Sequence, residues 1–160
     1  MGSKAILRDA ARILDRDQRN IISRWTQRVV KTEAVRSRQD LHLQEVLGAI
    51  PLLLTALAGW LRKGDFDEPL NPPEDVRLKA RTHAEIRLEH GFHLADVLAD
   101  FQLLRGEIWR AVCVELYEMH SNPDDILFLG QQLNYALDGV LAATAEACCE
   151  LSRRKGRAGW

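Results

Sequence analysis

Apolar residues recur along most of the chain at the three- and four-residue spacing that is typical of an α-helix. Near the N-terminus, Ile6, Ala10 and Ile13 fall on one side of such a helix, and Trp25 and Val29 continue the pattern. The spacing does not decide whether this stretch forms one helix or two. No segment shows the convincing alternation of apolar and polar residues that a half-buried strand requires. The pattern therefore predicts an all-α fold.

Proline and glycine residues mark the ends of the later helices. A helix is expected to start between Asp40 and Pro51 and to end near Gly64, and Pro51 either lies in its first turn or kinks a longer helix. Gly91 is placed to end the next helix. Residues 64–75 contain three prolines and are the clearest internal loop. We expect five to seven helices in a single all-α domain spanning residues 1–160, in which residues 1–3 are either native or a tag remnant. The later helices are expected at 76–90, from 93 to about 120, and from 124 to about 153.

The helix expected at 76–90 carries an unusual set of polar residues, which belong to the stretch "HAEIRLEHGFH". At 100° per residue, His83, Arg87 and His90 fall within about 80° of arc together with Val76 and Ala80. The acid-rich side of the helix lies opposite. The histidines and Arg87 are therefore expected to face inward.

Arg105 interrupts the apolar stripe of the following helix, four residues after Phe101 and three before Ile108. A charged residue in such a stripe needs an ionic partner or a route to solvent. One interpretation is a long side chain that reaches water, and the other is an ion pair that positions helices. Asp138 or Glu146 would supply the acid in the second case.

Only the short connection at Gly91 separates these two helices, so they are expected to be neighbours in space. We therefore predict that His83, Arg87 and Arg105 belong to one polar element inside the core or at its edge. This element is not expected to be a catalytic or a metal site.

The last expected helix has two apolar sides instead of one. A strong stripe of large residues faces the core, and Gly139, Ala142 and Ala143 form a second side of small residues. A second apolar side suits packing against another helix, such as one from a second subunit. The pattern predicts a homodimer formed through this helix, which is also long enough to carry a signal out of the domain.

No motif for catalysis or metal binding is present. Cys113, Cys148 and Cys149 form no CxxC pair, and HExxH, GxSxG, GxGxxG and the phosphate-binding GxxxxGK[ST] are all missing. "HAEIR" is faintly similar to the phosphoacceptor box of histidine kinases, but no ATP-binding motif accompanies it. We expect no catalytic residue, metal or cofactor. If haem were bound, His83 or His90 would be its axial ligand, although Arg87 between them argues against this.

Charge and hydropathy exclude further classes of function. The 22 Lys and Arg residues against 23 Asp and Glu residues give a net charge of -1, so no strong field favours nucleic acid. The longest apolar run, at 47–61, is shorter than the roughly 20 residues of a membrane span. Three cysteines and no signal peptide favour the reducing cytoplasm.

The segment "RTHAEIRLEHGFHLADVLADFQLLRGEIW" resembles the N-terminal sensory domain of RsbR-type stressosome co-antagonists, a module also found on some sensor histidine kinases. "IISRW" and "IPLLLTALAGWL" upstream fit the same layout. The family often has Glu-Tyr before its final Leu-Arg, where this chain has Asp100 and Phe101. The residues that carry the resemblance are His83, Arg87, Gly91, Leu94, Leu98, Leu104 and Arg105.

The resemblance implies a globin-like helical fold without haem, a homodimer, and a non-enzymatic role in stress signalling. In this family the domain usually precedes an output module, which is a STAS domain or a kinase. Two alternatives remain at this point, a haem-binding gas sensor and a purely structural dimerisation module. Likeness of fold alone does not identify the stimulus.

Overall fold

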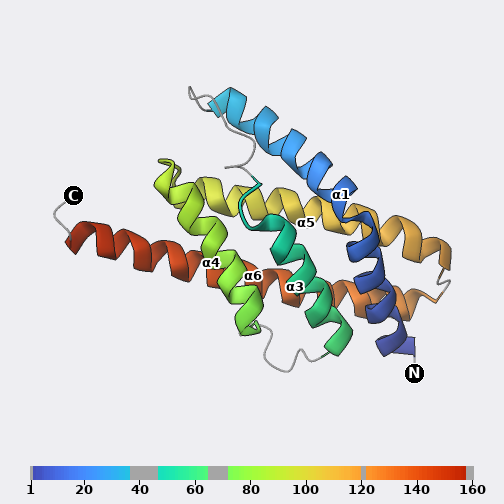
Figure 1. Cartoon of the computed structure of the whole chain (residues 1–160). Coiled ribbons are helices and arrows are strands. Elements are labelled where there is room, and N and C mark those ends of the chain that lie inside the picture. Colours follow the sequence, from blue (N-terminus) through green and yellow to red (C-terminus); the bar gives the residue numbers. More distant parts are fainter. Residues whose placement is uncertain (1, 37–46, 65–71, 120–121, 158–160) are drawn as a thin grey trace.

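The computed structural model describes residues 2–36, 47–64, 72–119 and 122–157. These residues form helices α1 (Gly2–Arg36), α3 (Ile50–Lys63), α4 (Glu74–Glu89), α5 (Leu94–Met119) and α6 (Pro123–Arg157) (Figure 1). There is no strand in the described ranges. The predicted all-α class and the long C-terminal helix are thus confirmed. The N-terminal stretch, which the sequence left undecided, is one helix of 35 residues.

Local chemistry explains where several of these helices begin and end. Pro51 lies in the first turn of α3, where its missing N–H leaves no hydrogen bond unmade. Gly64 ends α3 in a left-handed conformation (φ 63°), and its N–H donates to the Trp60 carbonyl. Gly91 (φ 82°) turns the chain after α4. The Asn122 side chain accepts a hydrogen bond from the N–H of Asp124 at the start of α6.

The helices pack around one apolar core. Helix α1 packs closely on α3 and α5, whereas α4 packs closely on α6 and α3 and touches α5 much less. In Figure 1, α3 and α4 cross in front of α6, and the last turns of α6 extend beyond the other helices. None of the described helices is long and apolar enough to cross a membrane. The largest fully buried apolar side chains include Ile6, Trp25, Leu53, Leu57, Leu61 and Leu104.

Candidate functional site

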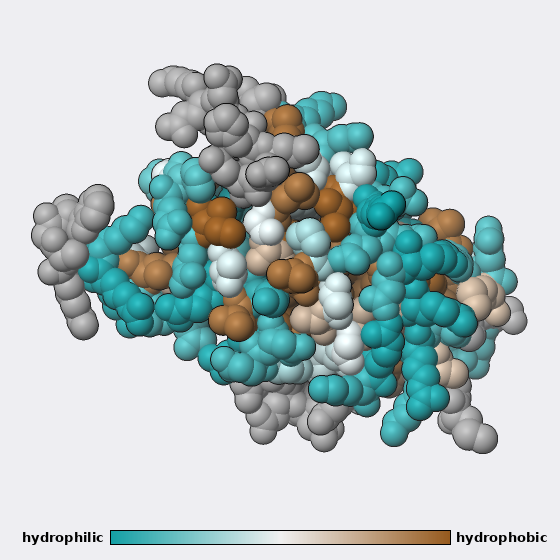
Figure 2. Space-filling view, viewed as in Figure 1, coloured by the Kyte–Doolittle hydropathy of each residue, from teal (hydrophilic) through white to brown (hydrophobic). Residues whose placement is uncertain are grey.

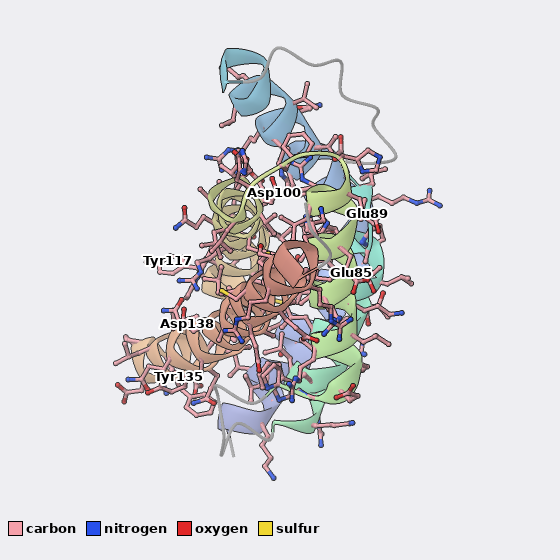
Figure 3. All side chains as sticks on the ribbon, turned by 90° about the vertical axis from the view of Figure 1, so that its left-hand side faces the viewer. Glu85, Glu89, Asp100, Tyr117, Tyr135 and Asp138 are labelled. Atoms are coloured by element: carbon pink, nitrogen blue, oxygen red, sulfur yellow. The ribbon has the colours of Figure 1, made fainter. Side chains whose placement is uncertain are left out.

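Asp100 on α5 is the centre of a buried polar cluster between helices. Arg87 on α4 donates from Nε to Asp100 Oδ2 (2.8 Å) and from one terminal nitrogen to Oδ1 (3.3 Å). His83, one turn earlier on α4, places Nε2 3.1 Å from Asp100 Oδ2. All three residues are at most 2% exposed. We call His83, Arg87 and Asp100 the Asp100 cluster; Figure 3 shows Asp100 inside the fold, between α5 and α4.

Aromatic residues from two other segments surround this cluster. The Trp25 indole of α1 donates to the Asp100 carbonyl oxygen (2.8 Å), and its ring meets the His83 ring edge-on at 6.1 Å. Phe101 meets the other side of His83 at 5.3 Å. The Arg87 guanidinium lies 3.7 Å from the centre of the Phe92 ring, a cation–π contact. The cluster therefore joins α1, α4, α5 and the α4–α5 turn.

Gly48 covers the remaining nitrogen of the His83 ring. A Cβ atom at Gly48 would lie 2.9 Å from His83 Nδ1, and Gly48 has a φ of +47°, which side chains rarely adopt. Within the described part of the chain, Nδ1 has no hydrogen-bond partner. Because a carboxylate only accepts, the bond to Asp100 requires the ring proton on Nε2. His83 thus binds Asp100 through Nε2, and the backbone at Gly48 covers Nδ1.

This arrangement is suited to holding helices together. The Asp100 carboxylate already accepts hydrogen bonds from Arg87 and from His83. A positive charge and a negative charge are buried together, so each removes the desolvation penalty of the other only while both remain. The described residues contain no group of three or more His, Cys, Asp or Glu side chains that could hold a metal ion.

His90, also expected to face inward, lies at the surface. It follows the last residue of α4 and is exposed. Its Nδ1 lies 2.6 Å from the Ile86 carbonyl oxygen, to which it donates. The helical face that carries His83 and Arg87 therefore ends before His90.

The structure places Arg105 apart from His83 and Arg87. Five residues after Asp100, it lies about 140° around the helix and faces α6. It donates to Asp138 Oδ1 at 2.5 Å, and the two side chains are 30% and 50% exposed. Of the two acids considered, Asp138 is the partner, whereas Glu146 lies 3.9 Å from Arg77 of α4. Arg105 thus combines both interpretations, since it forms an ion pair and also reaches solvent.

A second carboxylate on α5 is buried in a different way. Glu107 is 2% exposed and accepts hydrogen bonds from Arg24 Nε (2.9 Å) and from an Arg28 terminal nitrogen (3.1 Å), both on α1. The two arginine side chains are 38% and 52% exposed. Glu107 therefore links α1 to α5 through cations that still touch water.

Sequence reasoning did not identify Asp100, Glu107 or Gly48 as site residues. A signal was present for the two acids, because they lie seven residues apart and flank Leu104 on the apolar stripe of α5. An acid repeated at helical spacing within such a stripe needs a cation from a neighbouring helix. No comparable signal singles out Gly48, because its need to be glycine comes from contact with His83.

The three small residues predicted to form a dimer surface do not share one environment. Gly139 is buried within the chain, and Ala143 is half-buried in a groove between α6 and α4. Only Ala142 is exposed. The outward side of α6 therefore differs from the predicted one and includes Leu127, Gln131, Tyr135, Asp138, Ala142 and Cys149.

Comparison with known proteins identifies the family. The model of the family described as "RsbT co-antagonist protein rsbRD N-terminal domain" matches residues 19–158, most of the chain. No curated protein matches, and no solved structure matches. The chain belongs to the rsbRD N-terminal domain family, which confirms the resemblance seen in the segment from Arg81 to Trp109.

Proposed function

We propose that this member of the rsbRD N-terminal domain family is a non-enzymatic, cytoplasmic sensory domain that binds no haem and acts as a homodimer. It passes a signal to an output module, a STAS domain or a histidine kinase, in the full-length protein. Membership of the family supports the role in stress signalling. The observation that carries the proposal is the Asp100 cluster, whose histidine, arginine and carboxylate bind one another in the interior of the fold.

The surroundings of the two candidate histidines support a domain without haem. An axial ligand needs a ring nitrogen that faces an opening large enough for a porphyrin. In His83, Nε2 is bonded to Asp100 and Nδ1 is covered by Gly48. The cavity between α3, α5 and α6 measures about 10 Å³, enough for about one water molecule. A globin-like helical arrangement is part of the proposal, and the small size of this cavity supports the absence of haem.

Absorbance spectroscopy tests the proposal directly. We expect protein produced with an ample haem supply to show no stoichiometric Soret band. A band that is present in the wild type and disappears in His83→Ala or His90→Ala would overturn it. Gln131→Ala, which changes an exposed residue of α6, is the matched control.

An exposed apolar surface on α5 and α6 supports the homodimer. Among the residues that the structure describes, five of the eight exposed large hydrophobic side chains lie at the end of α5 or on α6. Figure 3 shows Tyr117, Tyr135 and Asp138 on one side of the molecule and Glu85 and Glu89 on the opposite side. Asp138 on this side of the molecule is paired with Arg105. A second copy of the chain would cover this surface with the same residues across a two-fold axis. The five residues are Val114, Tyr117, Met119, Leu127 and Tyr135.

Light scattering tests the dimer. Ala142→Glu places a charge on the exposed side of α6 and is expected to give a monomer with unchanged far-UV circular dichroism. Leu52→Glu is the control, because Leu52 is 56% exposed on α3. Figure 2 shows the face of α3 and α4, where apolar areas are broken up by polar ones. A wild-type monomer at high micromolar concentration would rule out the dimer.

The small size of the cavity between α3, α5 and α6 also favours a second candidate, a dimerisation module that senses nothing. The two functions differ in the full-length protein. If the domain only dimerises, replacing it with an unrelated dimeric coiled coil preserves a stress-dependent output. If it senses, the same replacement makes the output independent of stress.

A further inference from the structure

We propose that the groove between α4 and α6 binds a small zwitterion, an α-amino acid with an aliphatic side chain. The inference rests on the proposed sensory role and gives that role a chemical class of stimulus. The groove lies between the first two turns of α4 and the C-terminal half of α6, two helices that cross in Figure 1. It has a volume of about 120 Å³, compared with about 10 Å³ for the cavity between α3, α5 and α6. It therefore holds several water molecules, or one small solute in their place.

The lining of the groove carries both signs of charge. Three glutamates and two arginines line it, and both helices contribute to the set. A phosphate ion would gain the arginines but would also meet three carboxylates. A metal ion is not favoured either, because the described residues contain no group of three or more His, Cys, Asp or Glu side chains that could hold one. A ligand with one positive and one negative group suits this lining best. The charged residues are Glu74, Arg77, Arg81, Glu146 and Glu150.

One arginine and one glutamate of the groove already bind each other. Arg81 donates to Glu150 (2.9 Å) and to Glu85 (2.9 Å). Glu150 also accepts a hydrogen bond from Arg154 (2.5 Å). The hydrogen bond from Arg81 holds the pKa of the Glu150 carboxyl below its usual range. These residues therefore form one end of the groove and leave the binding of a ligand to its other charged side chains.

Arg77, Glu74 and Glu146 are held much more loosely. Arg77 comes no closer to Glu146 than 3.9 Å, which is too long for a hydrogen bond, and the two side chains are 43% and 73% exposed. Glu74 is exposed and forms no ion pair with another residue that the structure describes. An α-amino acid carries its carboxylate and its ammonium group on the same carbon atom, so it can bind Arg77 and Glu146 at once by entering the gap between them. Glu74, one turn before Arg77, offers a second carboxylate to the ammonium group.

The rest of the groove is apolar, and on the side of α6 its residues are small. Leu78 of α4 is 49% exposed, and Ala143 and Ala147 line the groove from α6. The short side chains of the two alanines leave room for an aliphatic group above them. Such a group would cover Leu78 and remove apolar surface from water. We therefore expect the groove to prefer L-valine to glycine several-fold.

A titration followed by heteronuclear NMR spectroscopy tests the inference, with L-valine as the probe at pH 7 and low salt. We expect the amide signals of the groove residues in α4 and α6 to shift saturably. The expected dissociation constant is on the order of 1 mM, because the contacts form in an open groove. N-acetyl-L-valine lacks the ammonium group and isobutylamine lacks the carboxylate. Each is expected to bind about ten-fold more weakly or worse.

Substitutions at exposed positions test the individual contacts. Arg77→Ala and Glu146→Gln are each expected to weaken the binding of L-valine about ten-fold or more. Arg12→Ala, which removes an exposed, ion-paired arginine of α1 outside the groove, is the matched control and is expected to keep the wild-type affinity. Leu78→Ala is expected to bring the affinities for L-valine and glycine close together. Far-UV circular dichroism is expected to be unchanged in all four variants.

Three results would overturn the inference. The first is the absence of a saturable shift at L-valine concentrations far above the expected dissociation constant. The second is binding of N-acetyl-L-valine or isobutylamine as tight as that of L-valine, which would mean that a single charge is enough. The third is an unchanged affinity in Arg77→Ala or Glu146→Gln, which would place the ligand elsewhere. None of these results affects the spectroscopic and light-scattering tests of the proposed function, so the two failures are distinguishable.

Discussion

Asp100 and Glu107 are two buried carboxylates seven residues apart on α5, and their cationic partners meet solvent very differently. Asp100 is bound by Arg87 and His83, which are 1% and 0% exposed. Glu107 is bound by Arg24 and Arg28, whose side chains are 38% and 52% exposed. The chemistry of the contacts is similar, so the comparison isolates the effect of burying the cation.

The difference lies in what remains after one partner is removed. Without Asp100, the buried Arg87 side chain loses a carboxylate that it binds through two nitrogens. Without Glu107, the side chains of Arg24 and Arg28 turn toward the solvent, which hydrates their charges. Breaking a buried pair costs about 3–5 kcal/mol, whereas an exposed pair is worth about 0–1 kcal/mol. The Asp100 cluster is thus expected to contribute much more to the free energy of unfolding than the Glu107 contacts do.

The largest expected effect comes from Arg87→Ala. Removing the guanidinium leaves the Asp100 carboxylate buried, with His83 as its only side-chain donor among the described residues. We expect the free energy of unfolding, measured by urea titration, to fall by about 3–5 kcal/mol, with helicity retained in the folded state. A urea midpoint equal to that of the wild type would show that the pair contributes nothing to stability. The proposed difference between the Asp100 and Glu107 sites would then be wrong.

Two glycines, one beside each buried carboxylate site, allow a matched test of how closely the surrounding atoms pack there. Gly48→Ala forces a Cβ to within 2.9 Å of His83 Nδ1 at a φ of +47°, and we expect it to destabilise the fold by about 1–3 kcal/mol. A Cβ at Gly106 meets only the end of the flexible Arg28 side chain, at 3.4 Å. Gly106→Ala in α5 is therefore expected to be neutral or to stabilise by up to about 1 kcal/mol. Equal loss of stability in both variants would contradict the view that only the Asp100 site is closed.

The same contrast shows how far the sequence predicts the structure. Helical spacing, with Pro51, Gly64 and Gly91 as end signals, predicts most of the helices because these effects are local. Helical spacing also indicates that His83 and Arg87 face inward. It does not indicate how deep a side chain lies, because depth depends on which helices cover it.

Pairing across helices is where sequence reasoning failed. Arg105 lies near the apolar stripe of α5, but 140° from Asp100 it meets α6 and not α4. The cluster instead forms around Asp100, because α4 and α1 approach that side of α5. Pattern analysis of one helix cannot supply the direction of approach of another.

A smaller effect is expected for the arginines that reach water. Arg28→Ala leaves Glu107 paired with Arg24, and Arg105→Ala leaves Asp138, which is 50% exposed, free to be hydrated. We expect each to lower the free energy of unfolding by about 0–1 kcal/mol, and 1 M salt to reduce the difference from the wild type. Losses as large as that of Arg87→Ala would show that exposure of the cation does not decide the outcome.

The smallest expected effect depends on pH and concerns an exposed pair at the same junction of α1 and α5. Arg16 donates to Glu115 (2.7 Å) and lowers the pKa of that carboxyl below its usual range. Because the folded pKa is below the unfolded one, the contribution of Glu115 to stability is complete above the ordinary carboxyl range. It is lost as the pH falls through the lowered value. We therefore expect urea midpoints of the wild type and Glu115→Gln to differ slightly at pH 7 and to converge in acid. A difference that persists unchanged at low pH would mean that Glu115 acts through packing and not through its charge.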